Sequence, residues 1–382
     1  MNTPFDNIKK LGFGLMRLPK CGDEIDIEQT KAMVDKFISS GFTYFDTAYV
    51  YGGSEEATKK ALVDRYPRES YQLATKLAPW VNCESREDAI KQFETSLERT
   101  GAGYFDFYLM HNLGGDRTKV FDNWDLWSFA MEKKAEGLIK HIGFSAHCTP
   151  EELDKILTAH PEAEFVQLQI NYADWEYPTI LSRRMYEVAR KHNKPIIVME
   201  PVKGGMLADP PASVRDILHN AEPDMSYASW AIRFAAGLDG VITVLSGMSN
   251  MEQMEDNISY MSEFSGLNTE QKCILNNVRD VIASLPIIPC TSCDYCLKVC
   301  PMQIGISASF SAMNYYTIYS DKEKAMARIQ RGVIDKGKNT ANQCIFCGRC
   351  EKACPQHIKI RDHLLDISKT LVLKNKRRKS KA

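Results

Sequence analysis

The chain has 382 residues, of which 44% are hydrophobic and 25% are charged, and its formal net charge is −1. This composition is ordinary for a globular protein with a sizeable core, and the length favours two or more domains. A nearly neutral chain gives no reason to expect nucleic acid as a partner. No apolar stretch approaches the roughly 20 residues that span a bilayer, and no secretory signal is visible, so we expect a cytoplasmic protein without membrane contact.

From residue 11 to about residue 250, short apolar runs alternate with longer amphipathic ones. Two of the amphipathic runs begin with helix-capping signals, because Ser85 precedes Asp88 by three residues and Thr149 precedes Pro150. Eight strand–helix units in about 240 residues predict a (β/α)8 TIM barrel. A doubly wound sheet is the alternative, but Gly12-Phe13-Gly14 lacks the third glycine of its fingerprint. The predicted strands are Leu11–Met16, Tyr44–Ala48, Tyr71–Lys76, Phe105–His111, Ile139–Ala146, Phe165–Ile170, Pro195–Glu200 and Val241–Gly247.

The domain boundary is predicted near residue 286. A helical pattern covers Asn268–Leu285, and the sequence Pro286-Ile287-Ile288-Pro289 cannot continue it. We therefore assign residues 1–265 to the barrel, 266–289 to a helical linker, 290–366 to a cysteine-rich domain and 367–382 to a basic tail. A further helical pattern at Lys322–Val333 indicates that the cysteine-rich domain is a small, largely helical ferredoxin-like domain, or a shorter one with an insertion.

Four polar side chains fall at or just after the carboxyl ends of predicted strands, where TIM barrels place catalytic groups. They are Asp46, Tyr51, Lys76 and His111. A phenol has a reference pKa near 10, and a lysine ammonium about 4 Å away favours the phenolate by roughly 4 kcal/mol. A carboxylate keeps such a lysine charged, and a histidine can share a hydrogen bond with a substrate carbonyl. The set is typical of proton transfer to a carbonyl that receives hydride from a cofactor.

Eight of the twelve cysteines fall into two runs near the C-terminus. Each run has the spacing C-x2-C-x2-C-x3-C-P of bacterial ferredoxins, in which three thiolates hold one cluster and the fourth reaches the other. Structural zinc is the alternative, but it typically uses C-x2-C pairs that are well separated. We therefore predict one [4Fe–4S] cluster on Cys290, Cys293, Cys296 and Cys354, and a second on Cys344, Cys347, Cys350 and Cys300.

The ordered motifs Phe45-Asp46-Thr47-Ala48, Tyr51-Gly52-Gly53-Ser54-Glu55, Lys76 and Tyr108-Leu109-Met110-His111 resemble those of the aldo-keto reductases. The whole chain resembles members that carry a C-terminal 4Fe–4S ferredoxin-type domain. This resemblance implies an NAD(P)-dependent (β/α)8 enzyme without metal in the barrel. It also implies that Tyr51 is the general acid/base, that Lys76 and Asp46 tune it, and that His111 orients the carbonyl.

The resemblance further implies a nucleotide cleft with four departures from the family. Ala146 replaces a common asparagine, and Met199 replaces the aromatic residue that commonly stacks on the nicotinamide. Asn250 and Gln253 stand where Lys or Arg usually grips a 2′-phosphate, which leaves the nucleotide open with a slight preference for NADH. The implied cofactor contacts are Gly14, Met16, Ser145, Gln167, Met199, Pro201, Val202, Lys203, Gly204, Gly247, Met248, Ser249, Gln253, Asp256 and Asn257.

Three functions are compatible with these features. The first is an oxidoreductase acting on a small carbonyl or alcohol substrate, whose clusters exchange electrons with an external carrier such as a ferredoxin or a flavodoxin-like protein. The second is the same enzyme with purely structural clusters, and the third is a non-catalytic electron-transfer or redox-sensing subunit. We favour the first, although hydride carries two electrons and each cluster normally takes one. Three tryptophans lie in predicted loops: Trp80, Trp124 and Trp127. The sequence is compatible with two roles for them, lining the substrate pocket and packing at the rim of the barrel.

Overall fold

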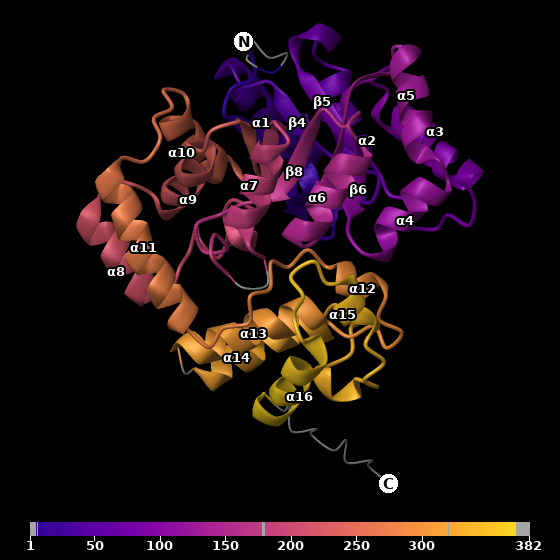
Figure 1. The fold of residues 1–382 in the computed structure, drawn as a ribbon. Coiled ribbons are helices and arrows are strands. Elements are labelled where there is room, and N and C mark those ends of the chain that lie inside the picture. The colour runs from indigo at the N-terminus through magenta and orange to yellow at the C-terminus, as the bar shows by residue number, and fades with distance from the viewer. Residues whose placement is uncertain (1–4, 6, 178–179, 320, 372–382) are drawn as a thin grey trace. The chain divides into compact units, whose positions relative to one another are not determined.

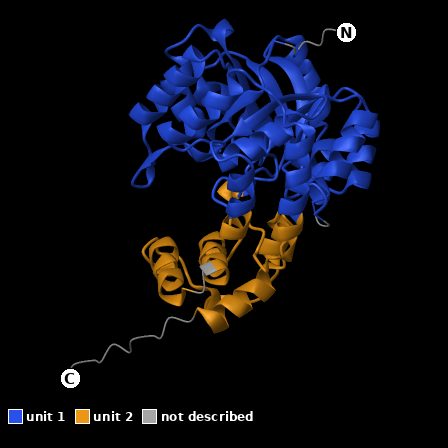
Figure 2. Cartoon of the chain, turned by 90° about the vertical axis from the view of Figure 1, so that its left-hand side faces the viewer, with its two compact units in different colours: residues 1–203, 207–210, 215–279 blue, residues 204–206, 211–214, 280–382 orange. Residues whose placement is uncertain are grey.

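The chain is represented by a computed structural model that describes residue 5 and residues 7–177, 180–319 and 321–371. It separates into two compact units (Figure 2). The first contains residues 1–203, 207–210 and 215–279, and the second contains residues 204–206, 211–214 and 280–382. The predicted linker helix is present as α11 (Thr269–Ser284), and the division between the units falls within it.

The first unit is built on eight parallel strands. These are β1 (Leu11–Gly14), β4 (Tyr44–Asp46), β5 (Gln72–Leu77), β6 (Phe105–Leu113), β7 (Ile139–Ala146), β8 (Phe165–Gln169), β9 (Ile196–Met199) and β10 (Val241–Ser246). They close in the order β1-β10-β9-β8-β7-β6-β5-β4, which confirms the predicted TIM barrel. All nine residues of β6 are buried, as expected for strands that are covered on both faces.

Helices surround this barrel (Figure 1). They are α1 (Ile27–Ser39), α2 (Ser54–Thr58), α3 (Arg86–Thr100), α4 (Asp116–Asn123), α5 (Leu126–Ala135), α6 (Pro150–Ala159), α7 (Ser182–Lys191), α8 (Ala212–Ala221), α9 (Tyr227–Ala236) and α10 (Met251–Met261). A small hairpin, β2 (Lys20–Cys21) and β3 (Glu24–Ile25), precedes α1. Both predicted caps are present: Ser85 forms a reciprocal capping box with Asp88, and Thr149 accepts from the backbone N–H of Glu152.

The second unit is a small helical domain. Its helices are α12 (Tyr295–Lys298), α13 (Ile306–Tyr319), α14 (Lys322–Ile329), α15 (Arg349–Ala353) and α16 (Ile360–Thr370). Helices α13 and α14 occupy the stretch between the two cysteine runs, and buried side chains such as Phe310, Val333 and Leu364 form the core. Helix α16 enters the stretch assigned to the basic tail, and residues 372–382 of that tail lie outside the described residues.

One short segment of the loop after β9 also belongs to the second unit. Gly204 has φ +67, and a Cβ atom on it would lie 2.5 Å from the carbonyl oxygen of Thr291. A larger residue is therefore excluded both by the backbone conformation and by the close approach of Thr291. Thr291 lies between the predicted ligands Cys290 and Cys293.

Among the described residues, no helix combines the length and the apolar character that a membrane-spanning segment requires.

The capping box of α3 provides a test of the fold. We expect Ser85→Ala to lower the free energy of unfolding by about 1 kcal/mol, because the backbone N–H of Asp88 loses its acceptor. Thr95→Ala, on the exposed face of the same helix, is the control and should cost nothing, since alanine favours helices. Urea denaturation of both variants measures the difference, and equal stabilities would contradict a capping role for Ser85.

Candidate active site and iron–sulfur sites

The candidate active site is a layer of side chains above the apolar interior of the barrel. The apolar layer includes Tyr44, Ala74, Leu109, Phe165 and Ile197. Two positions later in the same strands stand Asp46, Lys76, His111, Gln167 and Met199. Because side chains two residues apart in a strand lie on the same face, these five share the inner face at the carboxyl end of the barrel.

A buried ion pair lies in this layer. Lys76 Nζ donates to Asp46 Oδ1 at 2.6 Å and to the carbonyl oxygen of Thr47 at 2.6 Å. Lys76 is 1% exposed and Asp46 is 3% exposed. Burial raises the pKa of Asp46 and lowers the pKa of Lys76, while the charge of each partner opposes the shift. Each charge in the pair therefore depends on the other.

The ring of Tyr51 lies beside this pair and beside His111. Lys76 Nζ is 5.1 Å from the centroid of the Tyr51 ring. The rings of Tyr51 and His111 have centroids 6.0 Å apart and are nearly perpendicular, at 86°. The structure thus brings together all four residues that the sequence nominated as catalytic.

Two hydroxyl groups hold the loop that carries Tyr51. The Oγ1 of Thr47 and the Oγ of Ser54, on either side of Tyr51 in the sequence, are 2.8 Å apart and hydrogen-bonded. Ser54 Oγ also donates to the carbonyl of Leu15 at 2.9 Å. The Tyr51 N–H donates to the carbonyl of Ala48 at 2.9 Å, which closes the turn. These contacts explain why a residue in a loop has a defined position.

Trp80 belongs to the same site. Its Nε1 donates to the carbonyl of His111 at 3.1 Å, and the two rings have centroids 5.8 Å apart. Trp127, by contrast, is 5% exposed and stacks on His160 with centroids 4.2 Å apart. Of these two tryptophans, Trp80 contacts a candidate catalytic residue and Trp127 has a packing role.

Unsatisfied polar groups mark the part of the site assigned to the nicotinamide. Within the described part of the chain, Gln167 Oε1 and both polar atoms of the Asn112 side chain are buried without a hydrogen-bond partner. Ser145 Oγ accepts from the Asn112 N–H at 2.8 Å. Buried polar groups are normally paired, so an amide ligand suits this region. Asn112 was missed by the sequence analysis, although it directly follows His111 and has a φ of 62°, a conformation that asparagine tolerates.

The loop after β9, which the resemblance assigns to the pyrophosphate, has an internal ion pair. Lys203 Nζ binds Asp174 Oδ1, and both side chains are buried. Gln169 and Asn171 each donate to Asp174 Oδ2 at 2.7 Å. In this structure the charge of Lys203 is therefore matched by a carboxylate, and its contact with a pyrophosphate stays a prediction. Pro201, Val202 and Gly204 lie in the same loop.

The predicted adenosine contacts lie at the end of β10 and on α10. Asn257 donates to Ser246 Oγ at 2.6 Å, and the backbone N–H of Ser249 donates to Gln253 Oε1 at 2.8 Å. Ser249 Oγ donates to the backbone carbonyl of Arg17 at 2.8 Å. The Arg17 side chain lies near Gly247, since a Cβ atom on that glycine would be 3.8 Å from Arg17 Cδ. Arg17 was also missed by the sequence analysis, which considered only the positions where the family usually has a cation. The remaining predicted contacts are Gly14, Met16, Gly247, Met248 and Asp256.

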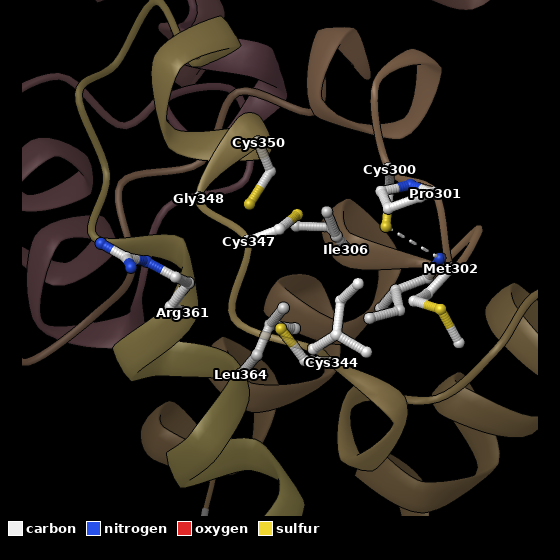
Figure 3. Close-up of a pocket in the computed structure, with 12 residues that line it drawn as sticks. Cys300, Pro301, Met302, Ile306, Cys344, Cys347, Gly348, Cys350, Arg361 and Leu364 are labelled. Atoms are coloured by element: carbon white, nitrogen blue, oxygen red, sulfur yellow. Dashed lines mark hydrogen bonds between the residues drawn. The ribbon is translucent and has the colours of Figure 1, made fainter.

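The eight clustered cysteines line two separate cavities in the second unit. One is lined by Cys300, Cys344, Cys347 and Cys350, and Figure 3 shows their sulfur atoms around it. The other is lined by Cys290, Cys293, Cys296 and Cys354. In both cavities the fourth thiol comes from the other run, as the ferredoxin spacing predicts.

The surroundings of the thiols fit an iron–sulfur cluster. The backbone N–H groups of Ser292 and Phe346 point at the sulfur atoms of Cys290 and Cys344, each at 3.4 Å, which stabilises thiolates. Burial, supported by the negative charge of Glu351, raises the pKa of the Cys350 thiol to about 11. Metal binding requires the thiolate form of cysteine, so an iron–sulfur cluster held in this cavity would offset that shift.

The buried ion pair provides the test of the active-site geometry. Asp46→Asn leaves the Lys76 charge unpaired, and Lys76→Met leaves the carboxylate unpaired, so each should cost about 3–5 kcal/mol of unfolding free energy. The double variant removes both charges and should be more stable than either single variant. Urea denaturation of the three variants measures this. Additive losses in the double variant would contradict a coupled buried pair.

Comparison with known proteins was made for both units. A model of the aldo/keto reductase family matches residues 10–279, and a model of a 4Fe-4S dicluster domain matches residues 289–358. The 9,11-endoperoxide prostaglandin H2 reductase of Trypanosoma cruzi is 25% identical over 254 residues, covering 65% of this chain and 81% of that protein. An aldo-keto reductase of Strobilurus tenacellus is 31% identical over 215 residues, covering 52% of this chain and 60% of that protein.

Solved structures show the same barrel fold. An aldo-keto reductase from Bacillus halodurans has a TM-score of 0.58 at 23% identity, covering 71% of this chain and 92% of that one. An aldo-keto reductase from Klebsiella pneumoniae, solved in complex with NADPH, has a TM-score of 0.57 at 20% identity, covering 71% of this chain and 91% of that one. Because the family model spans well over half of its length, the chain belongs to the aldo/keto reductase family and is an oxidoreductase.

Proposed function

We propose that this enzyme uses NAD(P)H to interconvert a small carbonyl and an alcohol, with Tyr51 as the proton donor and acceptor. The observation that carries the proposal is that the Tyr51 ring lies beside both Lys76 and His111, while Lys76 is paired with the buried Asp46. Carbonyl reduction requires an acid, a group that adjusts the pKa of that acid and a group that orients the carbonyl.

Each of these side chains has a distinct part in the proposed proton transfer. The nicotinamide, when bound, supplies the hydride for the carbonyl carbon. Tyr51 donates its hydroxyl proton to the carbonyl oxygen, and the ammonium of Lys76 stabilises the phenolate that remains. Asp46 keeps Lys76 charged despite its burial. His111, whose ring is nearly perpendicular to that of Tyr51, would hydrogen-bond the same oxygen, which fixes the carbonyl for attack.

Two features support binding of the nucleotide in this cleft. The buried and unsatisfied Oε1 of Gln167 suits the amide donor of a nicotinamide carboxamide. Arg17 beside Ser249 supplies a cation near the adenosine end, and the Klebsiella protein was solved with NADPH. The cation and the Klebsiella complex support NADPH, whereas the Gln167 contact suits NADH and NADPH alike, because both have the same carboxamide. Titration with NADH and NADPH in parallel decides between the two nucleotides.

We further propose that the second unit holds two [4Fe–4S] clusters that exchange electrons with an external carrier. The two sets of four thiols support the number, and the exposed ligand Cys347 supports a redox role, because a purely structural cluster gains nothing from contact with solvent. Such thiol-rich sites require a reducing compartment, which supports a cytoplasmic location.

Replacing the phenol tests the proposed reaction. We expect Tyr51→Phe to lower kcat for reduction of 4-nitrobenzaldehyde by about 10²–10⁴-fold, because the proton donor is lost, while the Kd for the nucleotide is unchanged. Tyr49→Phe is the matched control, since that ring packs under Arg99 with the guanidinium 4.7 Å from its centroid. Turnover by Tyr51→Phe at the rate of the control would reject Tyr51 as the acid.

Iron counting tests the clusters and their pairing. Anaerobically purified protein should contain about eight iron atoms per chain. Cys293→Ser combined with Cys354→Ser affects one cavity and should remove about four, whereas Cys347→Ser combined with Cys354→Ser affects both and should remove about eight. Cys273→Ser, an exposed cysteine outside both cavities, is the control and should remove none. Complete iron loss in the first double variant would contradict the pairing.

A further inference from the structure

The second cysteine run carries an exposed apolar pair between two of its ligands. Ile345 is 58% exposed and Phe346 is 45% exposed, and they lie between Cys344 and Cys347. Among the described residues they are the two most exposed large hydrophobic side chains. Two adjacent apolar side chains beside a proposed cluster site form an exposed hydrophobic patch, and such a patch is typical of a surface that binds a partner.

The corresponding loop of the first run shows that folding does not require this pair. Phe346 has a φ of 57° and Ser292, at the equivalent position, has a φ of 55°. Both residues donate their N–H to a cysteine sulfur at 3.4 Å. A bulky side chain in this conformation is strained relative to serine, so Phe346 costs backbone energy as well as exposing an aromatic ring. Thr291, the counterpart of Ile345, is 1% exposed.

Positive charge borders the apolar pair. Arg349 and Lys352 are exposed and lie three residues apart on α15, so they share one face of that helix. Arg361 Nη1 donates to the Phe346 carbonyl at 3.4 Å, and Figure 3 shows Arg361 at the edge of the cavity. The nearby carboxylate of Glu351 is paired with Arg361 at 2.8 Å. The corresponding loop of the first run has Asp294 in place of Gly348 and is less basic.

From these observations we infer that Ile345, Phe346, Arg349, Lys352 and Arg361, here called the loop patch, form the docking surface for a small acidic one-electron carrier protein. The inference rests on the proposed clusters and goes beyond them by naming the surface and the chemistry of the partner. Cys347 is exposed in the free protein, and the apolar pair would exclude water from it once a partner has docked. The cations attract and orient an acidic partner. When a reduced cluster held in this cavity meets an oxidised carrier, one electron would pass to the carrier, which is reduced as the cluster is oxidised. A reduced carrier that meets an oxidised cluster would reverse this step.

Binding of an acidic 2[4Fe–4S] ferredoxin to the full-length, iron-replete protein tests the inference by calorimetry. Phe346→Ser introduces the residue that the corresponding loop of the first run has at this position. We expect this variant and the double variant Arg349→Glu/Lys352→Glu each to weaken binding by about tenfold at low salt. The affinity of the unmodified protein should fall as salt is raised, and the charge-reversed variant should lose most of that dependence. Met131→Ser, an exposed methionine on α5, and Lys322→Glu, on α14, are the matched controls and should bind like the unmodified protein.

Three outcomes would overturn the inference. They are equal binding by all variants, tighter binding of the basic protein cytochrome c than of the acidic ferredoxin, and binding to vesicles that contain anionic lipid without binding to the ferredoxin. Iron counting on every variant separates these outcomes from loss of a cluster. Failure of the proposed function would be seen independently, as missing iron in the unmodified protein or as carbonyl reduction that does not need Tyr51.

Discussion

The active site depends on an ammonium and a carboxylate that share the interior of the barrel. Lys76 and Asp46 are each almost fully buried. Burial raises the pKa of Asp46 and lowers the pKa of Lys76, and so favours the neutral form of each. Their contact at 2.6 Å and the Thr47 carbonyl favour the charged forms, and a hydrogen bond from Gln167 to Asp46 and the charge of Glu55 near Lys76 add to this. This burial serves the proposed function, because an ammonium in a site without water stabilises a neighbouring phenolate far more strongly than one in water does. The closed sheet, the apolar layer beneath the pair and the hydroxyl contacts of the Tyr51 loop all maintain this geometry.

The second unit solves a different electrostatic problem. Four thiols around one cavity repel one another when they are ionised. Backbone N–H groups that donate to the sulfur atoms reduce this repulsion. The two cavities are built by equivalent loops that have opposite surface character. One loop has a buried Thr291 and an acidic Asp294, and the other has exposed Ile345 and Phe346 with basic neighbours. On this asymmetry we base the proposal that a carrier docks at the second of two sites whose ligands are alike.

The chain thus combines two kinds of electron chemistry. The barrel is suited to a hydride, which carries two electrons and requires a proton at the carbonyl oxygen. The cysteine unit, with the clusters that we propose, would handle single electrons and would need a surface at which a carrier can dock.

Local pattern alone was enough to identify much of this protein. Strand–helix alternation predicted the barrel, and the ferredoxin spacing predicted which cysteines line each cavity, because both signals are periodic and short in range. The four residues proposed as catalytic could also be named from the sequence, since barrels place functional groups at strand ends, and their role stays a prediction. Contacts between distant segments were not accessible: Lys203 with Asp174, Arg17 beside Ser249, and Trp80 against His111. Exposure of Phe346 belongs to the same class, because the burial of a side chain is decided by the residues that fold over it, and those residues are far away in the sequence.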